Sequence, residues 1–274
     1  NGPVFYYVND EFQTNDVYCS APGASTNSGA RADSPKRWIS EILETYNLEP
    51  GDVVYVDTGR YQTPVATAVG DLDSGATSQD PSAQVTFLGS TNELAGGSLY
   101  IVSNPEESGF ELDGAYGIRF KRLGIQGASN GIALSQSFFI AHEWLDIRDC
   151  ENGVRANQSS NLVFSHVSLV ANRGAGVRFW GNNWHSMKMD ACLFWSNRFG
   201  LHLEQGSVQA SNSILGMLAS GSLGYYVHAD APQTVLQSDY NNLYVGHAGA
   251  AASALQRGGT PAARTTVSAT ASHW

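Results

Sequence analysis

The sequence predicts an all-β protein, a right-handed, single-stranded parallel β-helix in which coils of about 22–24 residues stack along one axis. A short phrase that begins with glycine recurs at Gly109, Gly131, Gly153, Gly176, Gly200 and Gly224. The intervals between these glycines are 22, 22, 23, 24 and 24 residues, and a fixed period of this length is typical of solenoid repeats. The second and fourth residues of each phrase are apolar while the third varies, which is the two-residue period of a strand.

A second strand follows within each repeat, over residues 123–125, 145–147, 167–169 and 192–194. Turn signals rich in Asn and Gly, such as Ser129-Asn130-Gly131 and Glu151-Asn152-Gly153, separate the strands. We expect Asn130 and Asn152 to bond backbone groups of the turns. A leucine-rich repeat has a similar length, but its Leu-x-x-Leu-x-Leu frame is absent from this sequence.

Stacking the coils at about 4.8 Å places the apolar residues in two inward columns. The columns are Phe110, Ile132, Val154, Val177, Leu201 and Tyr225, and Leu112, Leu134, Ala156, Phe179, Leu203 and Val227. A single coil cannot bury its own apolar side, so the stack is the stable unit.

The first part of the chain, residues 1–50, predicts a cap for the solenoid. Ser34 and Pro35 are typical of a helix N-cap and first turn, and Trp38, Ile39 and Ile42 follow at helical spacing. We therefore expect a helix over 35–46 that covers the open end and its unpaired backbone groups. Strands are expected at 53–57, 84–89 and 99–103, a parallel β-helix over 51–247, and an Ala/Gly/Thr-rich loop or linker over 248–274.

The composition limits the partners that the protein can bind. The 274 residues include 15% charged residues with a formal net charge of −10, against about 25% charged residues in an average domain. An acidic surface disfavours nucleic acid and anionic membranes, and no apolar run is long enough for a membrane-spanning helix. Cys19, Cys150 and Cys192 show no zinc-site spacing, and we expect Cys150 and Cys192 to be buried.

Two stretches in the N-terminal part resemble a known superfamily. Residues 35–43 (PKRWISEIL) and 49–61 (EPGDVVYVDTGRY) resemble the opening segment of pectin-lyase-like right-handed β-helix proteins. Residues 6–10, 16–19 and 239–244 are similar to β-helix modules of large secreted bacterial repeat proteins. The resemblance implies a secreted or cell-surface location and a longer parent chain. It implies no single activity, because the superfamily includes lyases, hydrolases, epimerases, adhesins and spacers.

Two outward columns on the repeated strand predict a carbohydrate-binding face. The third positions of the phrases are Glu111, Ala133, Arg155, Arg178, His202 and Tyr226, and the residues after the phrases are Asp113, Ser135, Asn157, Trp180, Glu204 and His228. Aromatic rings stack on pyranose faces and Arg binds carboxylates through two hydrogen bonds. We therefore expect a polysaccharide, with an acidic one favoured, to bind over Arg155, Asn157, Arg178, Trp180, His202, Glu204, Tyr226 and His228. The alternative is a solvated sheet face whose polar residues have no ligand.

Catalysis by the same face is a second hypothesis, in which Arg178, His202 and Glu204 act on an acidic glycan. A lyase needs a base and a cation beside the uronate carboxylate, for which Arg178 and His202 are candidates, with Tyr226 as proton donor. A hydrolase needs two carboxylates about 5–10 Å apart. Asp113 and Glu204 lie four coils apart, roughly 19 Å, so only Glu204 with Asp230 is left as a pair.

Two further possibilities complete the sequence-based predictions. Asp71, Asp73 and Asp80 have the carboxylate density of a calcium loop but lack the complete EF-hand pattern, and a solvated acidic loop is the alternative. His142 and His166 are 24 residues apart, near one coil, which predicts stacking on neighbouring coils. A structural spacer that self-associates through the solenoid ends, with no ligand, is the third functional hypothesis.

Overall fold

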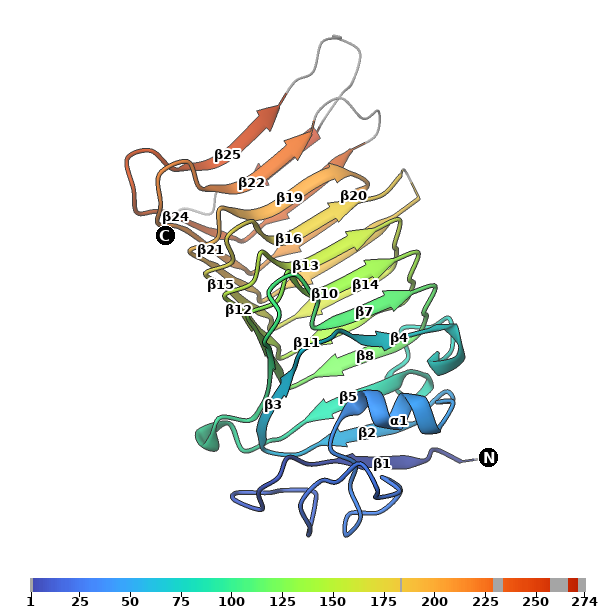
Figure 1. Ribbon diagram of the computed structural model, residues 1–274. Coiled ribbons are helices and arrows are strands. Elements are labelled where there is room, and N and C mark those ends of the chain that lie inside the picture. The colour runs from blue at the N-terminus through green and yellow to red at the C-terminus, as the bar shows by residue number, and fades with distance from the viewer. Residues whose placement is uncertain (1, 183, 229–233, 257–265, 271–274) are drawn as a thin grey trace.

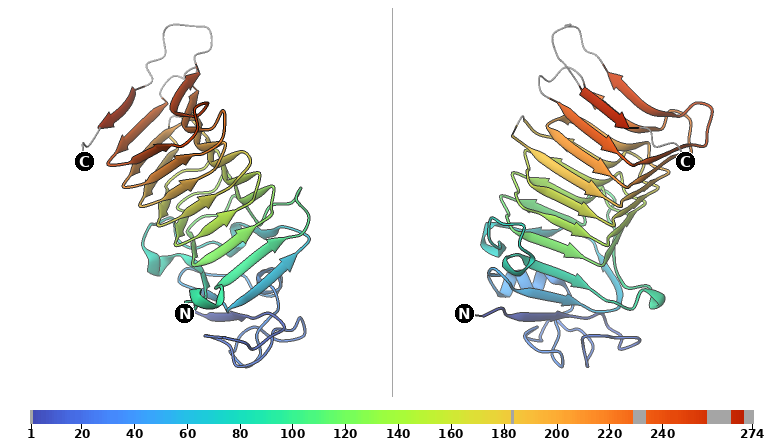
Figure 2. Two further views of the ribbon diagram at one scale, coloured as in Figure 1. Left: turned by 90° about the vertical axis from the view of Figure 1, so that its left-hand side faces the viewer. Right: turned by 180° about the vertical axis from the view of Figure 1, so that it is seen from behind.

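The computed structural model confirms the parallel β-helix, with three parallel sheets that enclose one core (Figures 1 and 2). The structure describes residues 2–182, 184–228, 234–256 and 266–270. From β2 onward the chain passes from sheet A to sheet B to sheet C in each coil, so that every strand pairs with the strand one coil away.

Sheet A contains β1 (Phe5–Val8), β2 (Val53–Val56), β5 (Val85–Gly89), β8 (Ile118–Lys121), β11 (Ala141–Glu143), β14 (Leu162–Ser165), β17 (Ser186–Asp190), β20 (Ser207–Ser211), β23 (Val235–Asp239) and β26 (Thr266–Thr270). Sheet B contains β3 (Gly59–Thr63), β6 (Ser98–Val102), β9 (Leu123–Gln126), β12 (Asp146–Arg148), β15 (Ser168–Val170), β18 (Leu193–Trp195), β21 (Ile214–Met217) and β24 (Asn242–Val245). Sheet C contains β4 (Thr67–Val69), β7 (Phe110–Asp113), β10 (Asn130–Ser135), β13 (Asn152–Asn157), β16 (Ala175–Trp180), β19 (Phe199–Gln205), β22 (Leu223–His228) and β25 (Ala251–Gln256).

The N-terminal helix is shorter than predicted. Helix α1 spans Ile39–Thr45, and its N-cap is Trp38 rather than Ser34. Lys36 instead pairs with β1, donating its amide to Tyr7 O and accepting from Asn9 N. Sheet pairing thus holds residues 35–38 extended and delays the helix, although Pro35 alone would suit a first turn.

Helix α1 caps the N-terminal end of the core, as predicted. Ile39 and Ile42 are fully buried in the core cluster, and the helix packs beside β4 at the first coil (Figure 1). Strand β1, inside the predicted cap region, adds one more strand to sheet A. Three short 3₁₀ helices, η1 (Asp71–Asp73), η2 (Pro81–Ala83) and η3 (Glu93–Ala95), lie in the loops that follow. No helix in the described ranges is long and apolar enough to cross a membrane.

Columns of like side chains fill the interior. Along sheet A, Phe87, Phe120, His142 and Phe164 follow one another, and the His142 and Phe164 rings are parallel at 4.2 Å. The predicted inward columns of sheet C are buried from Phe110 to Tyr225 and from Leu112 to Val227. The interior therefore agrees with the two-residue period of the strands.

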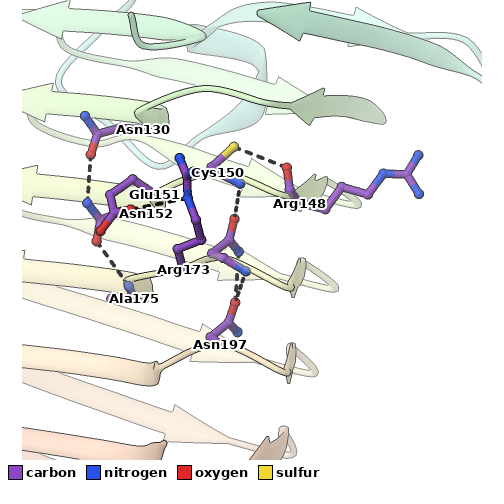
Figure 3. Close-up of polar contacts among 9 residues, drawn as sticks. Asn130, Arg148, Cys150, Glu151, Asn152, Arg173, Ala175 and Asn197 are labelled. Atoms are coloured by element: carbon purple, nitrogen blue, oxygen red, sulfur yellow. Dashed lines mark hydrogen bonds and ion pairs between the residues drawn. The ribbon is translucent and has the colours of Figure 1, made fainter. Parts of the chain in front are cut away.

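Buried asparagines tie the coils together at the corner between sheets B and C (Figure 3). Asn172 Oδ1 accepts from Cys150 N at 3.1 Å, and Asn172 Nδ2 donates to Ile147 O at 3.3 Å and to Asn197 Oδ1 at 3.0 Å. A second ladder runs from Asn152 Nδ2 to Asn130 Oδ1 at 3.2 Å and from Ala175 N to Asn152 Oδ1 at 3.1 Å. The predicted backbone role of these residues is confirmed for Asn152, which satisfies a strand amide, while Asn130 bonds neighbouring side chains.

The C-terminal segment differs from the predicted loop or linker. Strand β25 pairs with β22, and β26 pairs with β23, both in parallel. The last full coil presents a row of unpaired amides and carbonyls, and the Ala, Ser and Thr residues of 251–256 and 266–270 complete this row. The solenoid thus continues past residue 247.

Candidate functional site

The structure brings the first outward column together on sheet C as predicted. Backbone pairing places Glu111 beside Ala133, Ala133 beside Arg155, and so on through Arg178, His202 and Tyr226. Arg155 is exposed, while Arg178, His202 and Tyr226 are half-buried. Six successive strands therefore carry this column on one outer face.

The second column is in register only up to Trp180. Asp113, Ser135, Asn157 and Trp180 pair in order, but Trp180 then pairs with Gln205 instead of Glu204. A β-bulge in β19 accommodates one extra residue and shifts the pairing after Phe179 and Leu203. The prediction that Glu204 lies directly beside Trp180 is therefore wrong, because the bulge re-aims Glu204.

The bulge directs Glu204 toward Arg178. Arg178 Nε donates to Glu204 Oε1 at 2.7 Å, Arg178 Nη2 lies 2.5 Å from the same oxygen, and His202 Nε2 lies 3.6 Å from it. The three predicted catalytic residues are thus neighbours. The Arg178 guanidinium is already neutralised by Glu204, so it is not a free cation for a substrate carboxylate.

Aromatic packing that the sequence analysis did not anticipate surrounds His202. Phe199 and Tyr226 are stacked with ring centroids 5.0 Å apart, and the His202 ring meets Tyr226 edge-on at 4.7 Å. The Arg198 guanidinium lies over the Phe199 ring at 5.1 Å. The position of Phe199, two residues before an apolar position of the phrase, was the available signal. This end of the face is consequently filled by its own side chains.

The other end of the face is hollow. A depression of about 340 Å³ lies over β7, β10 and β13, lined on its outer side by Glu111, Asp113, Ala133, Ser135, Arg155 and Asn157. Ala133 and Ser135 are small, whereas the strands on both sides carry larger polar side chains at the paired positions. A gap of two strand spacings, roughly 9.6 Å, therefore separates the acidic wall from the Arg155 wall.

Charges around this hollow differ from those around Arg178. Glu111, Asp113 and Arg155 form no ion pair with any described residue. The Oδ1 atom of Asn157 is buried and has no hydrogen-bond partner in the described part of the chain. The hollow thus offers a cation, two carboxylates and an unsatisfied acceptor to a ligand.

The carboxylate pair considered for hydrolysis changes with the structure. Asp230 lies outside the described residues, and so does the side chain of His228, whose backbone belongs to β22. Glu111 and Asp113, two residues apart on β7, face the same side at about 6.6 Å along the strand. The sequence analysis missed this pair because it compared carboxylates only between coils.

The three aspartates predicted for calcium do not form a metal-binding group. Asp80 caps η2 by accepting from Ser82 N at 3.0 Å, and Asp73 is buried and accepts from Leu48 N at 3.4 Å. Desolvation raises the pKa of Asp73, which disfavours the charged form that a cation needs. Over the described ranges, no three His, Cys, Asp or Glu side chains gather as metal ligands.

Two smaller predictions also meet the structure here. Cys150 and Cys192 are buried, as expected, and burial raises the pKa of both thiols to about 11. His142 and His166 do not stack on each other. The coil offset in this part of sheet A is 22 residues, so His142 pairs with Phe164 inside the core, while His166 stacks on Trp144 outside.

Comparison with known proteins identifies the fold. No protein-family model matches the chain. No curated protein matches it either. Among solved structures it is similar to the crystal structure of pectate lyase Pel9A (TM-score 0.55, 14% identity, covering 99% of this chain and 79% of that one). It is also similar to a rhamnogalacturonan lyase (TM-score 0.57, 12% identity, covering 97% of this chain and 87% of that one).

The chain has the pectin-lyase-like fold. Within this pectin-lyase-like solenoid, the outer face of sheet C combines an open half over β7, β10 and β13 with a filled half over β16, β19 and β22.

Proposed function

We propose that this chain is a polysaccharide-binding β-helix module that binds an acidic glycan along the outer face of sheet C. The hollow over Ala133 and Ser135 is the observation that carries the proposal. Its Arg155 guanidinium suits a uronate carboxylate, and a sugar hydroxyl would supply the donor that Asn157 Oδ1 lacks. A buried acceptor without a donor costs about 1–3 kcal/mol, so this contact favours binding.

The filled half extends the proposed site. Trp180 is 45% exposed and offers an aromatic face for a pyranose ring. Arg178, His202, Glu204 and Tyr226 form a rigid, ion-paired wall beside it. A glycan of several units would start in the hollow and continue over Trp180.

The setting of the module belongs to the same proposal. Two proteins of this fold are a pectate lyase and a rhamnogalacturonan lyase, which supports a pectin-type acidic polysaccharide as the first ligand to test. We place the module in a larger bacterial protein, secreted or at the cell surface. Self-association through the solenoid ends is part of the spacer alternative, in which no sugar binds.

Isothermal titration calorimetry with oligogalacturonates and with neutral cello-oligosaccharides tests the proposal. We expect saturable binding of the acidic series only, weakened about tenfold or more by Arg155→Ala, since a hydrogen bond to a charged group contributes about 1.5–3 kcal/mol. Trp180→Ala should weaken only the longer oligomers. Absence of binding to either series would instead favour a structural spacer.

A lyase or hydrolase is the second candidate. The contact of His202 with Glu204 and Tyr226 favours a lyase, in which His202 would remove the proton next to the carboxylate and Tyr226 would protonate the leaving oxygen. The Glu111 and Asp113 pair has the spacing of a hydrolase pair, but both side chains are exposed. Ultraviolet absorbance of unsaturated products would support the lyase, and new reducing ends without that absorbance would support the hydrolase.

A further inference from the structure

A second hollow lies at the corner where the chain passes from sheet A to sheet B, a corner that sheet C does not share. Its volume is about 300 Å³. The outer strands β6 and β9 form its floor, and the loop at Gly96 and Gly97 forms one lip. Arg122, Trp144 and His166 line the other side.

These three residues form a column on successive coils. Lys121, Glu143 and Ser165 pair with one another across β8, β11 and β14, so the residues that follow them stack in the same order. Each adopts a left-handed backbone, with φ of 55° at Arg122, 56° at Trp144 and 57° at His166. That conformation costs a non-glycine residue roughly 1–2 kcal/mol, and Trp is an unusual occupant of it.

Trp144 presents an aromatic surface to this hollow. It is 50% exposed, and its ring stacks on His166 with centroids 4.2 Å apart and planes at 11°. His166 belongs to the next coil and covers one ring face. The opposite face is directed toward the coil of Arg122, whose guanidinium makes no cation–π contact with Trp144 within the described residues. Space for a ligand ring therefore lies between Trp144 and Arg122.

The charges of the corner hollow select an anion. Arg148 is paired with Asp146, with Nε and Oδ2 3.5 Å apart. Arg122 has no ion pair in the ranges that the structure describes, so it is the available cation. The lip of Gly96 and Gly97 has no atoms within 4 Å of the positions where Cβ atoms would lie. Access to Trp144 from this side is open.

We propose that the corner hollow is a second, independent site for an anionic sugar unit, with the pyranose ring stacked on Trp144 and its acidic group on Arg122. An aromatic face and a free guanidinium together match a ring that bears a carboxylate or a sulfate. A hollow of this size lies at the lower end of the range for small-ligand sites, which suits one or two sugar units. The chain would then contact glycan on two separate surfaces.

The test uses the indole N–H signals of the tryptophans, which report each site separately. Nitrogen-15-labelled protein is titrated with trigalacturonate, with a sulfated carrageenan oligosaccharide of similar length, and with neutral cellotriose. The Trp144 signal is assigned with Trp144→Phe. We expect a saturable shift of the Trp144 signal with one or both anionic sugars and none with cellotriose. Which anionic sugar binds more tightly distinguishes a carboxylate ligand from a sulfate ligand.

Variants separate this site from the sheet C face. Arg122→Gln should raise the Kd at Trp144 about tenfold or more and leave the Trp180 response unchanged. Arg173→Gln is the matched control, because Arg173 is exposed at a different corner and pairs with Glu151. No saturable Trp144 shift, an equal response to cellotriose, or an unchanged Kd in Arg122→Gln would each overturn the proposal. None of these outcomes depends on whether the Trp180 signal responds.

Discussion

The inner and outer sides of the sheet C strands obey different rules, although they alternate along the same residues. Inside, every large side chain meets a neighbour one coil away, and polar groups such as Asn172 and Asn197 are bonded to backbone and to each other. Outside, the Ala133 rung leaves a hollow between unpaired charges, while Arg178 and Glu204 fill the face with an ion pair. The inner side thus determines stability and the outer side is free to bind, and variants can separate the two.

The largest expected effect is on the inner side. Asn172→Ala should lower the free energy of unfolding by about 3 kcal/mol, because it leaves the buried amide of Cys150 and carbonyl of Ile147 without partners. Guanidinium unfolding measures this. The outward Asn157→Ala is the matched control, expected to stay within about 0.5 kcal/mol. Equal losses in the two variants would contradict the separation of the two sides.

The next effect concerns acid stability. His142 is fully buried between aromatic rings, and desolvation lowers its pKa to about 4 from 6.5. Below pH 6.5 the unfolded chain therefore binds a proton that the folded chain excludes, so stability falls as pH drops from 6.5 to 4, by up to about 3 kcal/mol.

His142→Phe tests this by removing the titrating group while keeping an aromatic ring in the column. The loss of stability between pH 7 and pH 4.5, measured by unfolding at each pH, should be smaller in this variant by about 2 kcal/mol. An identical loss in both proteins would show that His142 does not contribute.

On the outer side, filling the hollow should affect binding and not folding. Ala133→Tyr should weaken oligogalacturonate binding about tenfold or more, while the free energy of unfolding changes by less than about 0.5 kcal/mol. Val163→Tyr, an outward position on sheet A, is the matched control and should bind normally. The account fails if both tyrosine variants bind like the parent chain.

The smallest effect is that of the surface ion pair. Arg178 and Glu204 have side-chain exposures of 43% and 23%, and solvent screens such pairs. A double-mutant cycle with Arg178→Ala and Glu204→Ala should give a coupling of about 0.5 kcal/mol in unfolding experiments. A coupling several times larger would mean that this half of the face also contributes to the stability of the stack.

The sequence allowed the repeat, the strand register and the inward columns to be predicted, because each coil repeats the same constraint. Local signals failed where pairing at a distance prevailed. Ser34 and Pro35 suggested a helix start, but β1 holds Lys36 extended. The bulge at Glu204 shifted one rung, and an assumed 24-residue offset misplaced His142.

The candidate site was predicted only as a list of residue types. Its column of Arg155, Arg178, His202 and Tyr226 was correctly assigned to one face. The hollow was missed because it depends on the volumes of Ala133 and Ser135 relative to their neighbours. The pairing of Arg178 with Glu204 was missed because the bulge that creates it leaves no mark in the repeat.

Amide chemical-shift mapping with an oligogalacturonate tests the central claim most directly, because it locates the ligand on the solenoid without mutation. We predict saturable shifts at the amides of β7, β10 and β13 around the hollow, continuing toward Trp180 with longer oligomers. Binding that leaves these three strands unperturbed, or no binding at all, would contradict the assignment of the glycan site to sheet C.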